Sequence, residues 1–505
     1  MTERFDAIVI GSGAGGSTLA HALAPTGARI LIVERGDFVP QEAENWSPEA
    51  VWKQRRYRAR DVWVDAADGS EFSPYTHYCV GGNTKFWGAV LFRLRREDFG
   101  ELQHADGVSP AWPITYDDLA PYYDRAERLY DVHGEVGPDP TEPARGAFPL
   151  APLPHEPRME EMVERLRALG YHPSPLPLGI RAHCQRCDTC NSFPCRVHAK
   201  SDADVIAVRP ATQYPNVTLW TNTRAHRLLT DPSGRRVTGV VVERQGGTFT
   251  VEASVVVVAC GAVNSAALLL RSGGGVHRGG LANSSGLLGR NYMAHHATMI
   301  SAIGWRPNAT RFQKTLAIND FYLRGPGLPY PLGQIQSQGR IHPHMIQSGA
   351  PPKLRRAARH VPLWVYRLMW TSRSMDWLAM TEDLPHRENG ITLSADRIHL
   401  SYRPSNVRPH RELVTLTKRI LRSLGLRFPF ATSLGAGNTT HQCGTAVFGR
   451  DPRTSVLDPF CRAHDVENLF VVDASFFPSS AAVNPGLTIA AQALRVADHI
   501  KAHDL

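Results

Sequence analysis

The sequence predicts an α/β fold built from more than one domain. Short apolar runs typical of buried strands occur near the start, the middle and the end of the chain, and each precedes a segment with helical spacing of its apolar residues. The 505 residues exceed what one ordinary core holds together. The separated strand–helix pairs are therefore expected to meet in one domain, and the stretches between them to form a second, α+β domain.

The first of these units covers residues 6–34 and contains a glycine-rich turn. A short strand leads into Gly11-Ser-Gly-Ala-Gly-Gly16, and a helix and a second strand follow. Gly11 permits the tight turn, Gly13 lets the backbone approach a pyrophosphate, and Gly16 lets the helix pack on the strand. Glu34, at the end of the second strand, is placed to bind a ribose. The pattern predicts a Rossmann-like dinucleotide-binding domain and leaves NAD and FAD open.

Two later units have the same character. Val255–Gly261 is a strand that ends in glycine before a helix, and Asn468–Asp473 is a strand that ends in a carboxylate before the helical segment 488–500. Residues 217–252 alternate polar and apolar side chains around Asp231-Pro-Ser-Gly234, which predicts a hairpin.

Composition excludes several classes of protein. Lysine and arginine outnumber aspartate and glutamate by 56 to 47, but the excess is spread along the chain, so no nucleic-acid partner is expected. No apolar run reaches the roughly 18 residues of a membrane span, and the start lacks a signal-peptide pattern, so we expect no membrane span and a cytoplasmic location. The eight cysteines are then expected to be thiols or ligands.

A second glycine-rich loop lies at Cys79–Ala89. Gly81 and Gly82, followed by small polar residues and Trp87, suit a backbone pressed against a flat ring, although a plain turn would explain them equally well.

Together these segments resemble the glucose–methanol–choline (GMC) oxidoreductase family over nearly the whole chain. The resemblance rests on motifs that occur in the family's order: the N-terminal glycine turn, Gly81–Thr84, Trp112–Tyr123, Leu288–His295, Glu382–Pro385, Val472–Ser475 and Asn484–Thr488. It implies FAD, oxidation of an alcohol, and a substrate domain whose β-sheet covers the flavin. The cofactor-binding residues predicted from the motifs and the resemblance are Gly11, Gly13, Ala14, Gly16, Glu34, Gly81, Gly82, Asn83, Thr84, Trp87, Gly88, Ala225, Gly261, Asp473, Ala474, Asn484, Pro485 and Thr488.

The predicted domains are discontinuous. Residues 1–104, 201–298 and 438–505 are assigned to the FAD-binding domain, and residues 105–200 and 299–437 to the substrate domain.

Within the family the chain looks most like the branch of pyranose oxidases and bacterial C-glycoside 3-oxidases. The segments Thr439-Thr-His-Gln-Cys-Gly444 and Val483-Asn-Pro485 imply a catalytic pair of His441, as general base, and Asn484. The expected substrate is a glucopyranose or glycoside oxidised at a secondary ring hydroxyl, with C3 favoured over C2. We expect O₂ or a quinone-like compound to reoxidise the flavin; the oligomeric state is left open. Sugar contacts are expected within residues 300–440, where the candidates are Gln334, Gln336, His342, Trp364, Trp370 and Trp377.

One departure from that branch concerns the cofactor linkage. Its pyranose oxidases attach FAD to a histidine just before the loop tryptophan, whereas Phe86 precedes Trp87 here, so non-covalent FAD is predicted. The alternatives are a GMC alcohol or sterol dehydrogenase, a lyase like the hydroxynitrile lyases with structural FAD, and a flavoprotein without enzymatic activity.

Four cysteines, Cys184, Cys187, Cys190 and Cys195, lie within twelve residues. An iron–sulfur cluster and a zinc site are alternatives, but a reduced loop without metal is favoured. His342 and His344 lack further ligands, so no metal site is predicted. His295 and His296 are interpreted as structural.

Overall fold

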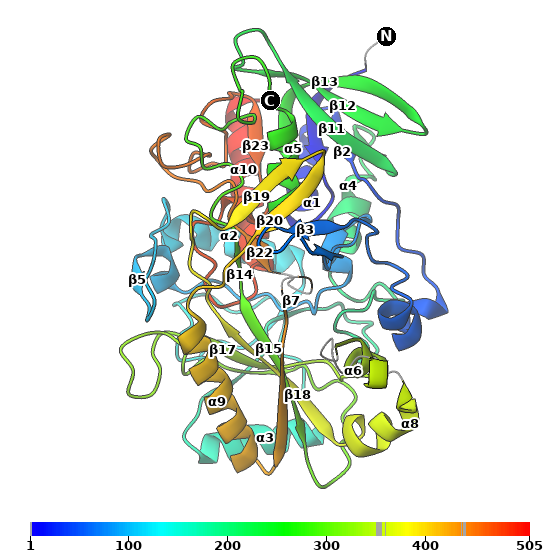
Figure 1. Cartoon of the computed structure of the whole chain (residues 1–505), viewed down its shortest axis with the longest axis vertical. Helices are drawn as coiled ribbons and strands as arrows, with labels where there is room; N and C mark the ends of the chain where they lie inside the picture. The colour runs from blue at the N-terminus through cyan, green and yellow to red at the C-terminus, as the bar shows by residue number, and fades with distance from the viewer. Residues whose placement is uncertain (1–2, 350–355, 359, 436, 438–440) are drawn as a thin grey trace.

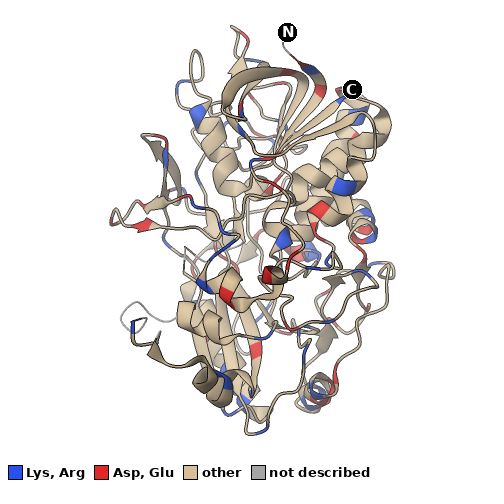
Figure 2. Cartoon of the chain, turned by 90° about the vertical axis from the view of Figure 1, so that its right-hand side faces the viewer, with Lys and Arg blue, Asp and Glu red and all other residues tan. Residues whose placement is uncertain are grey.

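The computed structural model describes residues 3–349, 356–358, 360–435, 437 and 441–505. Figure 1 shows an elongated molecule with one β-sheet toward each end and the chain termini at the same end. Among the described residues, no helix is both long enough and apolar enough to cross a membrane. Figure 2 shows lysine and arginine interspersed with aspartate and glutamate along the ribbon.

The upper sheet in Figure 1 has seven strands, in the order β10-β2-β1-β13-β12-β11, with β23 also paired to β13. β1, β2, β10, β13 and β23 pair in parallel, whereas β11, β12 and β13 form an antiparallel meander. The bounds are Arg4–Ile10 (β1), Ile30–Val33 (β2), Val217–Trp220 (β10), Thr223–Thr230 (β11), Val237–Arg244 (β12), Gly247–Val258 (β13) and Leu469–Val471 (β23).

Helices bury the parallel strands of this sheet. α1 (Ala14–Leu23) packs against α10 (Gly486–His503), which in turn packs against α2 (Tyr116–Leu129), and α5 (Ala262–Arg271) follows β13. Because the parallel part is covered, β2 is apolar and buried at every position instead of alternating. The predicted strand–turn–helix–strand unit, the hairpin around Asp231–Gly234 and the C-terminal strand and helix are confirmed.

The lower sheet has six antiparallel strands in the order β21-β15-β18-β17-β16-β8. This sheet packs with α3 (Pro157–Ala168) and α9 (Val407–Ser423) around a second hydrophobic core. The strand bounds are Pro173–Pro175 (β8), His296–Ile303 (β15), Leu316–Ile318 (β16), Gln334–Ser337 (β17), Ser374–Thr381 (β18) and Phe428–Ser433 (β21).

β8 has a proline at each end, Pro173 and Pro175. Proline lacks the N–H that a central strand donates, yet it is tolerated at an edge. β8 is the edge strand of this sheet, next to β16.

Smaller elements join the two halves. β19 (Gly390–Ser394), β20 (Arg397–Ser401), β3 (Trp63–Asp65) and β4 (Glu71–Phe72) form a four-stranded sheet. β14 (Met293–Ala294) pairs with β22 (Gln442–Cys443). The remaining short elements are β5 (Leu102–Gln103), β6 (Val108–Ser109), β7 (Val132–His133), β9 (Leu178–Gly179), α4 (Arg209–Ala211), α6 (Pro343–Gly349) and α8 (Leu363–Tyr366).

Candidate active site

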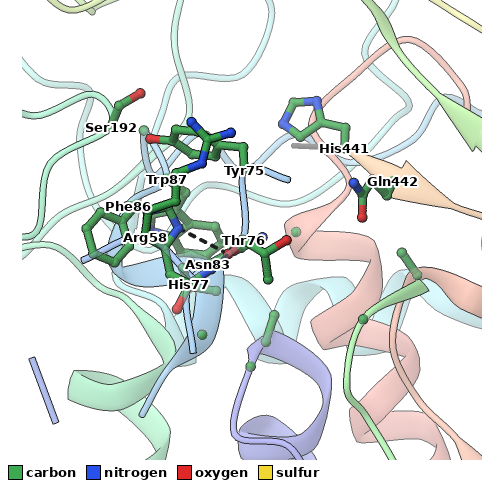
Figure 3. Close-up of a pocket in the computed structure, with 18 of the residues that line it drawn as sticks. Arg58, Tyr75, Thr76, His77, Asn83, Phe86, Trp87, Ser192, His441 and Gln442 are labelled. Atoms are coloured by element: carbon green, nitrogen blue, oxygen red, sulfur yellow. Dashed lines mark hydrogen bonds between the residues drawn. The ribbon is translucent and has the colours of Figure 1, made fainter. Parts of the chain in front are cut away.

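One cavity of about 960 Å³ is lined by strand ends of the seven-stranded sheet and by strands β15, β17, β18 and β21 of the six-stranded sheet. Figure 3 shows His441 and Gln442 at one side of it and Arg58, His77 and Phe86 at the other. A space of this size, walled by both sheets and rich in apolar surface, has the character of a cofactor and substrate site.

The glycine turn forms part of the wall because no side chain fills it. Gly11 has φ +102°, and a Cβ there would lie 2.4 Å from the Ala259 carbonyl oxygen. A Cβ on Gly13 would meet nothing within 4 Å, since this residue faces the cavity. Gly13 is also the N-cap of α1 and places no capping side chain over the first turn. The free N–H groups of that turn are therefore open to an anionic ligand.

The second glycine loop meets the first. The Gly81 N–H donates to Ser12 Oγ over 3.0 Å, and a Cβ on Gly82 would lie 3.5 Å from Gly13 Cα. The two glycine-rich segments thus meet and line one part of the cavity with backbone, and we call that part the glycine channel.

Two of the predicted cofactor-binding residues, Glu34 and Asp473, are carboxylates that line the same cavity and accept hydrogen bonds from other residues of the protein. Glu34 accepts hydrogen bonds from Ser12 N and Oγ, at 3.1 and 2.6 Å, and from Gly36 N at 3.0 Å. Asp473 accepts from Gly261 N at 2.9 Å and from the hydroxyl of Ser265, which ties β23 to the start of α5. Burial raises the pKa of both carboxyl groups.

Most predicted cofactor residues line the cavity, and three lie behind its wall. Gly16 packs on β1, where a Cβ would lie 2.1 Å from the Gly11 carbonyl oxygen, and Gly81 supports the second loop. Thr488 Oγ1 is hydrogen-bonded to Tyr123 Oη at 2.8 Å, away from the cavity. Those that line it are Gly11, Gly13, Ala14, Glu34, Gly82, Asn83, Thr84, Trp87, Gly88, Ala225, Gly261, Asp473, Ala474, Asn484 and Pro485.

His441 reaches the cavity through the pairing of β14 with β22. The two strands are antiparallel, with Met293 opposite Cys443 and Ala294 opposite Gln442. The residue that follows Ala294, His295, therefore lies against the residue that precedes Gln442, His441. Their Nδ1 atoms lie 3.0 Å apart, and His295 Nε2 lies 2.8 Å from the Ser480 carbonyl oxygen. Thr439 and Thr440, which belong to the same sequence motif, lie outside the described residues.

These contacts define the protonation of both rings. A carbonyl oxygen only accepts, so His295 Nε2 carries the proton and donates to Ser480. Burial lowers the pKa of His295 and keeps its ring neutral, which makes His295 Nδ1 an acceptor. His441 therefore donates from Nδ1 and keeps a lone pair on Nε2. Burial above all, and then the electrostatic influence of the neighbouring His295 and Lys314, lower the pKa of His441 well below its usual value.

Asn484 lies just before α10 in the same wall as His441. Its Oδ1 is buried and has no hydrogen-bond partner within the described part of the chain, and the same holds for Trp87 Nε1. Trp87 packs close to the start of α10, since a Cβ on Gly486 would lie 2.7 Å from its ring. Buried polar atoms of this kind normally have partners, so both point to a bound polar ligand.

Only part of the predicted sugar contacts face the cavity. Gln336 and Trp370 line it, and Gln336 Oε1 has no partner among the described residues. The others do not line it: Gln334 donates to Asn319, His342 contacts the Asp188 carbonyl, Trp364 is exposed and Trp377 is buried in the lower core. Sequence reasoning missed Lys314, which does line the cavity and had no motif to mark it.

The four clustered cysteines surround a separate cavity of about 20 Å³. We call this segment, residues 184–195, the cysteine loop. Burial raises the pKa of Cys184 to about 11 and also raises that of Cys190, so these thiols are protonated at neutral pH. No three His, Cys, Asp or Glu side chains in the described ranges lie where they could hold one metal ion. The absence of iron stays a prediction.

Comparison with known proteins defines the class of this site. The GMC oxidoreductase family models match residues 5–297, with the N-terminal model, and 385–493, with the C-terminal model. The chain belongs to the GMC oxidoreductase family, and it is an oxidoreductase acting on CH–OH donors. The family implies FAD, and the glycine channel, the free helix N-terminus and the unpartnered Asn484 and Trp87 atoms fit that cofactor.

The relatives include two oxidases at 34% identity. One is 6'''-hydroxyparomomycin C oxidase of Streptomyces lividus, matched over 99% of this chain and 92% of the relative. The other is paromamine 6'-oxidase of Streptomyces fradiae, matched over 98% and 90%. Among solved structures, pyridoxine 4-oxidase from Mesorbium loti superposes with a TM-score of 0.69 at 21% identity, covering 99% of both chains, which shows a shared fold.

Proposed function

We propose that this chain oxidises a hydroxyl group of a pyranose or glycoside to a carbonyl, with non-covalent FAD as hydride acceptor. The observation that carries the proposal is the His295–His441 contact, which leaves His441 Nε2 as an unprotonated base in the same cavity as Asn484. The names of the two relatives at 34% identity, both oxidases of sugar-containing compounds, support the substrate class.

His441 would remove the proton of the substrate hydroxyl. Nε2 accepts that proton while Nδ1 stays hydrogen-bonded to His295, so the ring need not turn during the reaction. FAD, when bound, supplies the acceptor for the hydride that leaves the same carbon, which yields the carbonyl. A positioned base of this kind contributes roughly 10²–10⁴ in rate.

Asn484 would fix which hydroxyl faces the base. Its free Oδ1 accepts a hydrogen bond, and its amide nitrogen can donate one, so it can hold the reacting hydroxyl or its neighbour. The start of α10 lies directly beyond Asn484 and places the positive end of a helix dipole at this end of the cavity.

The wall of the cavity favours a neutral sugar over a cationic one. Its carboxylates, within the described ranges, are Glu34, Asp61 and Asp473, and each is already bonded inside the protein. The six-stranded sheet contributes neutral groups such as Gln336 to the same cavity. An amino sugar would therefore find no free carboxylate for its ammonium groups.

We propose C3 of a glucopyranosyl ring as the position oxidised. The support is the resemblance to the glycoside 3-oxidase branch, and a glycoside fits because its substituted C1 then lies away from the reacting carbon. The second candidate is the 6' position of an amino sugar, which the name of one relative favours. O₂ or a quinone-like acceptor would reoxidise the enzyme.

An anaerobic screen tests the proposal. Free sugars, C- and O-glycosides, paromamine, sterols and simple alcohols are mixed with the FAD-loaded protein, and the visible flavin absorbance is followed. Glycosides should bleach it, and NMR of the product should show a C3 ketone. Bleaching by sterols or primary alcohols alone would refute the sugar assignment. O₂ or a quinone added afterwards identifies the acceptor.

A further inference from the structure

Lys314 is a buried lysine that the mechanism above does not use. The residue is 2% exposed, and it lines the main cavity. Its Nζ donates to Asn191 Oδ1 at 3.3 Å, a weak contact with a neutral group.

The other two buried lysines of the described chain are fully engaged. Lys85 Nζ lies 3.2 Å from Asp202 and 2.9 Å from Asp204. Lys200 Nζ donates to the carbonyl oxygens of Trp87 and Phe193 at 2.9 and 2.8 Å. Among the residues that the structure describes, Lys314 has neither a carboxylate nor a set of carbonyl groups around its amine, and burial lowers its pKa to about 7. A buried amine without a counter-charge is costly unless a ligand supplies one.

The amine lies at the catalytic end of the cavity. Lys314 precedes β16 of the six-stranded sheet and reaches across to the second glycine loop. A Cβ on Gly88 would lie 1.4 Å from Lys314 Nζ, so the amine occupies the space that a side chain would take. Gly88 follows Trp87, which packs at the start of α10, and the charge of Lys314 contributes to the low pKa of His441.

We propose that Lys314 is the anion-stabilising residue of the active site, placed to hold positive charge against a bound flavin ring when that ring becomes negative. The proposal rests on FAD binding within the proposed function, and it is independent of which sugar is oxidised. A negative ring next to the amine would favour the ammonium form and would itself be stabilised by it.

Sulfite provides a direct probe of this charge. It adds reversibly to oxidised flavin: the sulfur lone pair forms a bond to N5, the ring takes up the negative charge, and the visible absorbance is lost. The dissociation constant of sulfite is measured spectrophotometrically for the FAD-loaded wild type and for Lys314→Met and Lys314→Gln. Lys501→Met is the matched control, because it removes one lysine near the C-terminal end of α10, about 22 Å along the helix from its first residue, Gly486.

Both Lys314 variants should bind sulfite at least about tenfold more weakly than the wild type, and the control should match the wild type. FAD content confirms that each variant is folded, and glutamine tests whether a neutral donor suffices. Wild-type affinity in either variant, or no sulfite binding by the wild type, would overturn the proposal. Sulfite needs no sugar, so a failed substrate screen leaves this result unaffected.

Discussion

Replacing His295 by leucine should slow flavin reduction by the proposed sugar substrate about tenfold to a hundredfold while FAD remains bound. The His441 Nδ1–H loses its acceptor 3.0 Å away, and a buried donor left unpaired costs about 1–3 kcal/mol. The ring avoids that cost by moving its proton to Nε2, which removes the base. Each 1.36 kcal/mol corresponds to a factor of ten. The population of the His441 tautomer with a free Nε2 therefore falls about tenfold to a hundredfold, and the rate falls with it.

The assay is stopped-flow reduction of the flavin under anaerobic conditions. His295→Gln should recover most of the rate, because an amide oxygen can accept from His441 while the amide N–H₂ donates to the Ser480 carbonyl. His296→Gln, on the adjacent position, is the matched control, since His296 contacts Ser405 instead. An undiminished rate in His295→Leu, or a glutamine variant as slow as the leucine variant, would refute the tautomer argument.

The pH profile of the wild type gives an independent check on the same base. In the proposed mechanism His441 acts in its neutral form, and its lowered pKa keeps that form populated through neutral pH. The rate of reduction should therefore stay level and fall only below the ordinary histidine pKa of about 6.5. A decline that begins above that value would contradict the buried, neutral His441.

Four further predictions follow from other parts of the site. His441→Ala should retain FAD and reduce it at least about a hundredfold more slowly, and Asn484→Ala should be impaired less but give mixed regiochemistry by product NMR. Gly15→Ala should lower the melting temperature even without FAD, because its Cβ would lie 1.6 Å from the Val472 carbonyl oxygen, whereas Gly13→Ala should weaken FAD binding and leave that temperature unchanged. Acid precipitation should release the flavin into the supernatant, since Phe86 stands where the resemblance to pyranose oxidases places the linking histidine; flavin fluorescence on the denatured band would disprove this. Anaerobically purified protein should contain negligible iron and sulfide; stoichiometric iron would assign a cluster to the cysteine loop.

The strand–turn–helix segments could be predicted from sequence because their signals are local. The glycine spacing at Gly11–Gly16 and the apolar run of β13 each specify their structure within a few residues. His295 and Lys314 could not be predicted in their observed settings. Their partners, His441 and Gly88, lie 146 and 226 positions away, and the contacts depend on strand register and on packing between the two sheets.

The half of the molecule that holds the seven-stranded sheet closes only when the two ends of the chain meet. β13 pairs with β1, where Glu252 is opposite Arg4, and with β23, where Val256 is opposite Leu469, while α10 packs on α1. During synthesis at roughly 5–20 residues per second, the glycine turn leaves the ribosome roughly 20–90 s before β23 does. The early strands remain without their partners for that period, and pairing across such sequence separations is slow. A chain cut short before α10 would present exposed apolar edges to chaperones and proteases, so cofactor retention reports on completed synthesis as well as on correct folding.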